Sequence, residues 1–77
     1  MDTITITNKY DEEITIKIGD WVGFKSDIEQ AGKVTAIHQG QWLGNYILRL
    51  ENKNGFSGGY IGGNTTHNIN AKDCDLG

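Results

Sequence analysis

The sequence predicts a small all-β domain: five to six short antiparallel strands that form a barrel, with an extra N-terminal β-hairpin. Three observations lead to this prediction. Isoleucine and threonine, whose β-branched side chains suit strands, are abundant, whereas alanine is scarce and proline is absent. Eleven glycines punctuate the chain. Several short segments alternate strictly between polar and apolar residues, which is the pattern of a strand with one buried face.

The length of the chain limits it to one domain. A chain of 77 residues has room for a single small core, and a domain of this size buries only about 60% of the surface of its unfolded chain. The single cysteine excludes an intramolecular disulfide and a zinc site built from several cysteines. We therefore expect residues 1–77 to form one domain, with the hairpin at 1–18 and the barrel at 19–76.

The N-terminal hairpin is predicted from two alternating segments. Thr3–Thr7 and Glu13–Ile18 each place isoleucine at every second position. Residues 8–12 between them are polar and turn-forming. Two such segments joined by a short polar turn are typical of a β-hairpin.

The first barrel strand is expected to follow a tight turn at Gly19-Asp20. These two residues break the alternation and redirect the chain. Val22 and Phe24 then share one face of the predicted strand, which we assign to the core. Trp21 falls on the other face.

The second barrel strand is predicted at 32–39, after a polar segment at 26–31 that suits a loop or a single helical turn. Val34 and Ile37 are its apolar anchors. Their spacing of three does not match the two-residue period of a strand, so it predicts a β-bulge or a strong bend, which a small barrel needs in order to close.

The central strand is predicted at 46–51. Its inward-facing residues are expected to be Tyr46, Leu48 and Leu50. The Asn54-Gly55 pair that follows indicates a tight turn, because both residues tolerate a positive φ.

The C-terminal third of the chain is expected to complete the barrel. Residues 56–61 form a glycine-rich continuation strand, and 62–68 form a loop. Residues 69–76 end the chain as a short turn or strand. Ile69 and Leu76 are expected to fill the core from this element.

This order of elements resembles the SH3-like barrels of prokaryotes and phages, including KOW-type domains. The resemblance covers about residues 18–76 and leaves the first hairpin as an addition. It implies a barrel entered through a Gly-Asp turn and closed by a one-turn element with a leucine. The matching segments are Gly19-Asp20-x-Val22-x-Phe24, Gly32-x-Val34-x-x-Ile37, Tyr46-Ile47-Leu48-Arg49-Leu50 and a closing element at 71–76.

Exposed aromatic residues are the main candidates for function. Trp21 lies on the outward face of its strand, Trp42 in a turn and Tyr60 in the glycine-rich segment. Tryptophan and tyrosine dominate binding hot spots, so we assign these three residues to a protein-binding or self-association surface. The alternative for Trp21 is structural, with the added hairpin covering its indole.

Catalytic and cofactor chemistry finds little support in the sequence. The spacings of His38, His67 and Cys74 match no nucleophilic or metal site. The glycine-rich segment at 55–63 resembles a phosphate cradle, but neither a helix pattern nor a nearby lysine accompanies it, so a bulged hairpin is favoured. Asp73-x-Asp75 offers too few oxygen ligands for calcium. We expect no enzyme activity and no cofactor or metal.

A nucleic-acid-binding barrel is the alternative function. The net charge is −3 and the cations are scattered along the chain, which lowers the expectation of phosphate binding. Four of them would have to converge on one face: Lys17, Lys25, Lys33 and Arg49.

The sequence therefore predicts a non-enzymatic protein-interaction module. Its partner would be another protein or a second copy of the chain, bound through exposed aromatics and sheet edges. The resemblance implies a phage or mobile-element accessory protein that binds and modulates a host protein. A cytoplasmic location is expected from the lone cysteine and from the lack of a signal peptide or membrane-spanning segment.

Overall fold

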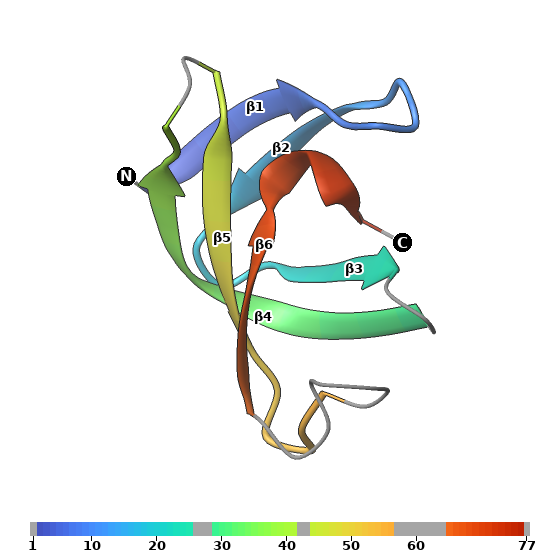
Figure 1. Cartoon of the computed structure of the whole chain (residues 1–77), viewed down its shortest axis with the longest axis vertical. Coiled ribbons are helices and arrows are strands. Elements are labelled where there is room, and N and C mark those ends of the chain that lie inside the picture. Colours follow the sequence, from blue (N-terminus) through green and yellow to red (C-terminus); the bar gives the residue numbers. More distant parts are fainter. Residues whose placement is uncertain (1, 26–28, 42–43, 57–64, 77) are drawn as a thin grey trace.

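The computed structural model describes residues 2–25, 29–41, 44–56 and 65–76, and it confirms the all-β class. The described residues contain no helical segment with the length and hydropathy of a membrane span. The chain runs through the elements in the order drawn in Figure 1. They are β1 (Thr3–Thr7), β2 (Glu13–Lys17), β3 (Trp21–Lys25), β4 (Glu29–Gln39), β5 (Tyr46–Glu51), β6 (Thr66–Asn70), the 3-10 helix η2 (Ala71–Asp73) and β7 (Cys74–Asp75).

The N-terminal hairpin forms as expected. Strands β1 and β2 pair antiparallel, with Ile4 opposite Ile16 and Ile6 opposite Ile14. All four isoleucines are buried, while the threonines, glutamate and lysine between them are exposed. The hairpin therefore presents one continuous apolar face to the rest of the molecule.

The joint between the hairpin and the main sheet is the predicted Gly19-Asp20 turn. Gly19 has a φ of 98°, a conformation that a side chain would strain. Its N–H donates to the carbonyl oxygen of Val34 at 2.8 Å, and the N–H of Val34 donates back to the carbonyl of Asp20 at 2.8 Å. The Asp20 carboxylate also accepts from the N–H of Lys17 at 2.9 Å. The turn thus ties β2, β3 and β4 together.

The remaining strands form one antiparallel sheet in the order β6-β5-β4-β3-β7. The long strand β4 pairs through its first half with β3 and through its second half with β5. The predicted irregularity is present in the half that pairs with β5. The β4–β5 register shifts between Val34 and Ala36, so that both Val34 and Ile37 face inward.

The expectation of a closed barrel is wrong for the described residues. The five-stranded sheet ends at β6 on one side and at the two-residue strand β7 on the other, and these two strands do not pair. The hairpin is a separate two-stranded sheet. Figure 1 shows the hairpin and η2 at the same end of the molecule. There the hairpin and η2 cover the core, in the place where a closed barrel would have a closing pair of strands.

The core is a single cluster that joins the hairpin to the sheet. Val22, Phe24, Leu48 and Leu50 are buried as predicted, and Tyr46 is half-buried against them. The buried cluster contains Ile4, Ile6, Ile14, Ile16, Val22, Phe24, Val34, Ile37, Leu48, Leu50, Phe56, Ile69, Ala71 and Cys74.

Three local expectations are corrected. Residues 29–31 belong to strand β4 and not to a loop, because they pair with β3. Residues 66–68 are likewise strand, because β6 pairs with β5 along its whole length. Leu76 does not enter the core: it follows β7 and is 49% exposed, while Cys74 takes the buried position. The predicted strand at 56–61 lies outside the described residues beyond Phe56.

Candidate docking surface

Trp21 is an exposed tryptophan on the outer face of the sheet. Strand β3 alternates so that Val22 and Phe24 face the core, which directs Trp21 outward. The residue is 57% exposed. The interpretation in which the hairpin covers Trp21 is therefore wrong, because the hairpin packs its isoleucines on the opposite, inner face.

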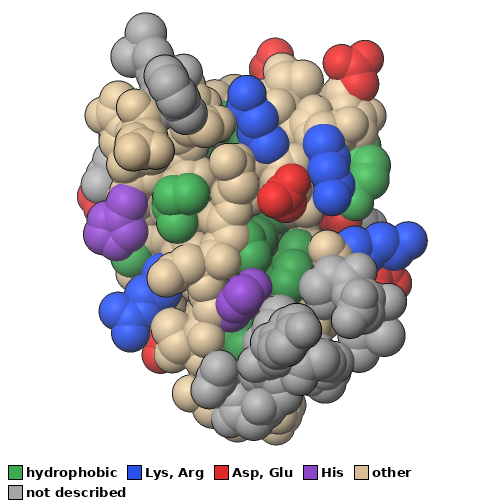
Figure 2. Space-filling view, viewed as in Figure 1, with side chains coloured by type: hydrophobic (Ala, Val, Ile, Leu, Met, Phe, Trp, Pro, Cys, Tyr) green, Lys and Arg blue, Asp and Glu red, His purple; other side chains and the backbone are tan. Residues whose placement is uncertain are grey.

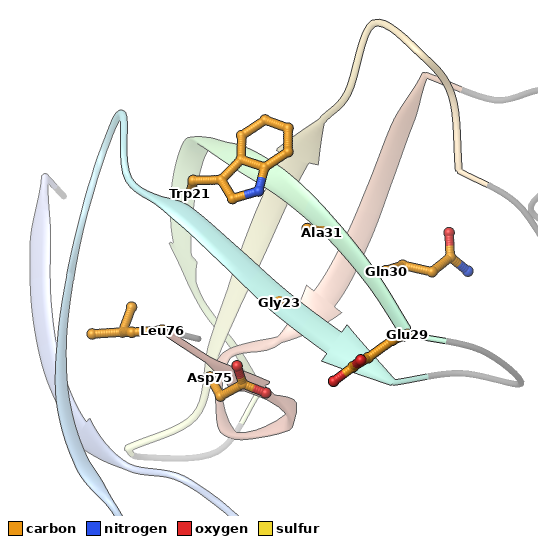
Figure 3. A pocket seen from close by; sticks show the side chains of 7 residues that line it. All are labelled: Trp21, Gly23, Glu29, Gln30, Ala31, Asp75 and Leu76. Carbon is orange, nitrogen blue, oxygen red and sulfur yellow. The ribbon is translucent and has the colours of Figure 1, made fainter.

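A groove of about 340 Å³ lies on one side of Trp21, and we call it the acidic groove. Small residues, Gly23 and Ala31, sit opposite each other on neighbouring strands and leave its centre open. Figure 3 shows larger side chains standing around this centre. The lining residues are Trp21, Gly23, Glu29, Gln30, Ala31, Asp75 and Leu76.

The carboxylate of Asp75 is positioned by the pairing of β7 with β3. Asp75 lies opposite Gly23 in this pairing. A Cβ atom at Gly23 would lie 3.3 Å from Asp75 Oδ1, so the absence of a side chain at this position leaves room for the carboxylate beside the β3 backbone. An acid from the end of the chain is in this way brought into the groove that Trp21 also lines.

A further groove of about 490 Å³ adjoins the acidic groove, and we call it the tyrosine groove. Glu29 and Asp75 line both grooves. Tyr10, which is 45% exposed, and Glu12 line it from the hairpin turn, and Lys25 lines it from β3.

The other side of Trp21 carries a mixed-charge groove of about 640 Å³. Lys33 lies directly across from Trp21 in the β3–β4 pairing and lies across from Glu51 in the β4–β5 pairing. The lining residues are Trp21, Lys33, Thr35, Glu51, Asn52, Lys53, Asn54 and Thr65.

Of the predicted protein-binding residues, the structure places Trp21 alone. Trp42 and Tyr60 lie outside the described residues. Glu29, Asp75 and Leu76 were not predicted as site residues from the sequence. Their shared location depends on the pairing of β7 with β3, which joins the end of the chain to its first third, and only an Asp-x-Asp pattern in a turn was visible in the sequence.

The four predicted nucleic-acid contacts do not form an uninterrupted basic patch. Lys25 lies opposite Glu29, and Lys33 lies opposite Glu51, so carboxylates alternate with ammonium groups across the strands. Lys17 and Arg49 are exposed on different sheets. Figure 2 shows the same intermixing on the face that it presents, where basic side chains stand among acidic ones.

Cys74 lies in the core and His67 packs on a core ring, whereas His38 is exposed on β4. The Cys74 thiol is buried and donates to the carbonyl oxygen of Ala71 at 3.0 Å. Burial raises its pKa from 9.0 to about 11, and the charges of Asp75 and Asp73 add to the rise. His67 stacks against Phe24, with ring centroids 5.4 Å apart, and so has a packing role. Within the described residues, no three metal-ligating side chains come together.

The glycine-rich segment at 55–63 is anchored at its beginning. Gly55 has the positive φ, 80°, that the Asn-Gly turn predicted. Phe56 is buried and packs on Phe24, with ring centroids 5.8 Å apart. The rest of this segment, from residue 57, lies outside the described residues, so the choice between a phosphate cradle and a bulged hairpin stays a prediction.

Comparisons with known proteins identify no relative. No protein-family model matches the sequence, and neither a curated protein nor a solved structure is significantly similar to the chain.

Proposed function

We propose that this chain is a non-enzymatic protein-interaction module whose outer sheet face binds a protein partner around Trp21. One observation carries the proposal: Trp21 is 57% exposed and lines grooves on both of its sides. Tryptophan is among the residues that contribute most to the binding energy of interfaces, because it buries a large rigid surface. An exposed tryptophan between two grooves offers such an anchor together with space for the partner's side chains.

The charge arrangement favours a protein over a nucleic acid as the partner. A surface that binds nucleic-acid phosphates carries a cluster of lysine and arginine side chains with few carboxylates among them. Here Glu29 faces Lys25 and Glu51 faces Lys33 across the strands, on the same surface as Trp21. The phosphate backbone of a nucleic acid bound on this face would be repelled by both carboxylates.

The narrower function rests on the sequence. An SH3-like module of a phage or mobile element that acts on a host protein in the cytoplasm is our proposal from the resemblance over residues 18–76 and from the lone cysteine. A strongly bent sheet and a one-turn element before the last strand are compatible with that resemblance.

The proposal is tested by capture on the immobilised chain. Wild-type, Trp21→Ala and Ile18→Ala chains are exposed to a bacterial lysate, and the retained proteins are quantified by mass spectrometry. Ile18 is a matched control because it is apolar and 41% exposed but does not line the grooves around Trp21. We expect the Trp21→Ala chain alone to lose a specific partner. Equal retention by all three chains would refute a docking role for Trp21.

Self-association is examined in the same samples. Light scattering of the purified chain shows whether a second copy occupies the surface. A dimer that dissociates in the Trp21→Ala variant identifies the partner as the chain itself, whereas a monomer leaves the surface to a different protein.

A further inference from the structure

We propose that the partner presents a cationic segment to this surface, with an arginine or lysine side chain lying in the acidic groove against Trp21. This inference rests on the proposed function and adds the chemistry of the partner. It follows from the shape of the groove, from the charges that line it and from the position of the indole.

The groove accepts a long, thin side chain. Its centre is formed by Gly23 and Ala31, which lie opposite each other and have no bulky side chain. Trp21 bounds it at one end, and Leu76, which is 49% exposed, bounds it on the β7 side. The aliphatic part of an arginine or lysine would lie over the small residues between these two apolar groups.

The charge of the lining selects a cation. Glu29 and Asp75 line the acidic groove, and both continue into the tyrosine groove, where Glu12 adds a third carboxylate. The ammonium group of Lys25 is the one basic group among the residues that line these two grooves. Three carboxylates against one ammonium leave the joined grooves with an excess of negative charge, which attracts a basic segment.

Trp21 strengthens the preference for a cation and orients it. An indole ring attracts a guanidinium or ammonium group placed over its face. On the other side of Trp21 the groove is lined by Lys33 and Lys53 with Glu51, so the cation belongs on the β7 side. Arginine is favoured over lysine, because a planar guanidinium both stacks on an aromatic ring and binds a carboxylate through two hydrogen bonds.

The test uses fluorescein-labelled synthetic peptides of equal length in which leucine alternates with arginine, lysine, glutamine or glutamate. Binding is measured by fluorescence anisotropy at low and at physiological salt. We expect affinity to fall in the order arginine, lysine, glutamine, glutamate, and the affinity of the arginine peptide to fall with added salt. The Trp21→Ala variant should also bind the arginine peptide more weakly.

Charge reversal locates the contact. Glu29→Lys should lower the affinity for the arginine peptide by about tenfold or more, which is the size expected for removing a close charge pair. Glu51→Lys is the matched control, because it makes the same change of net charge in the groove on the other side of Trp21. Circular dichroism confirms that both variants fold. Equal weakening by the two variants overturns the proposal, because the effect would then be one of overall charge.

The remaining outcomes also decide the question. If the glutamine or glutamate peptide binds as tightly as the arginine peptide, or if no peptide binds, the proposal that the partner presents a cationic segment is refuted. The docking function survives that result if Trp21→Ala still loses its partner in the capture experiment. Both proposals fail if Trp21→Ala retains the same proteins as the wild-type chain.

Discussion

The side chain of Asn8 donates a hydrogen bond from Nδ2 to the carbonyl oxygen of Cys74 at 3.0 Å, across 66 positions of sequence. Its Oδ1 accepts from the N–H groups of Tyr10 and Glu12, each at 3.0 Å, so the amide also shapes the hairpin turn. Asn8 is buried. The turn is thereby fastened to β7, the strand that carries Asp75 to the wall of the acidic groove.

Replacing Asn8 with alanine should destabilise the chain by about 2–3 kcal/mol, because it leaves buried backbone groups without partners. Urea unfolding followed by circular dichroism measures the change. Asn68→Ala is the control, since Asn68 is exposed on β6, and a surface change of this kind costs no more than about 0.5 kcal/mol. Similar losses in the two variants would contradict a structural role for the Asn8 amide.

Gly32→Ala should destabilise the chain by about 1–3 kcal/mol, because it overpacks the core. A Cβ atom at Gly32 would lie 2.9 Å from Phe56 Cζ and 3.0 Å from Leu50 Cβ. Thermal unfolding measures the loss. In a Phe56→Leu background the outer ring atoms are gone, so the same substitution should cost less. An equal cost in both backgrounds would show that Phe56 is not the obstacle.

Trp21 and Phe24 should differ sharply in their contribution to stability. Phe24 is buried in the core, so Phe24→Ala should cost about 3–5 kcal/mol. Trp21 is 57% exposed, and Trp21→Ala should cost less than about 1 kcal/mol. Denaturant unfolding of both variants checks the contrast. A large loss for Trp21→Ala would mean that the residue stabilises the fold and that its loss of binding is indirect.

The Cys74 thiol should make stability depend on pH in the alkaline range. Its pKa rises from 9.0 to about 11 in the folded chain, so the folded state favours the protonated thiol. This contribution is complete below pH 9 and is lost as the pH rises toward 11. The difference in unfolding free energy between wild type and Cys74→Ala should therefore shrink between these values. A constant difference would contradict the prediction.

The same thiol should react slowly. A pKa near 11 instead of 9.0 lowers the thiolate fraction at neutral pH by about 100-fold, and burial blocks access as well. Iodoacetamide labelling, followed by mass spectrometry, should be far slower in the folded chain than in urea. Comparable rates would show that Cys74 is accessible in the native state.

Local patterns were sufficient to predict several features of the fold. The alternation of isoleucine in Thr3–Thr7 and in the following segment predicted the hairpin, because a two-residue period directs one face inward whatever the partner. The odd spacing of Val34 and Ile37 predicted the bulge in β4. The alternation around Val22 predicted that Trp21 faces outward, although it did not show whether another element covers the indole.

Little of the candidate site was predicted, because pairings between distant segments, and not local patterns, bring its residues together. Glu29 lies in a polar segment that was predicted as a loop or a single helical turn, and it joins the sheet by pairing with Lys25. Asp75 ends a strand of two residues and Leu76 follows it, and two residues are too few to show a period. Leu76 was expected in the core from its hydrophobicity and from the closing leucine that the resemblance implies, whereas the pairing of β7 gives the buried position to Cys74.

Local sequence patterns alone establish that this chain is an all-β protein with an N-terminal hairpin, and that Trp21 and Val22 lie on opposite faces of a strand. These properties follow from side-chain branching and from the geometry of a single extended strand. The tertiary structure shows that the sheet stays open, that the hairpin packs on the inner face, and that Asp75 lines the same groove as Trp21. Such outcomes depend on pairings between residues far apart in the chain, which no local pattern encodes.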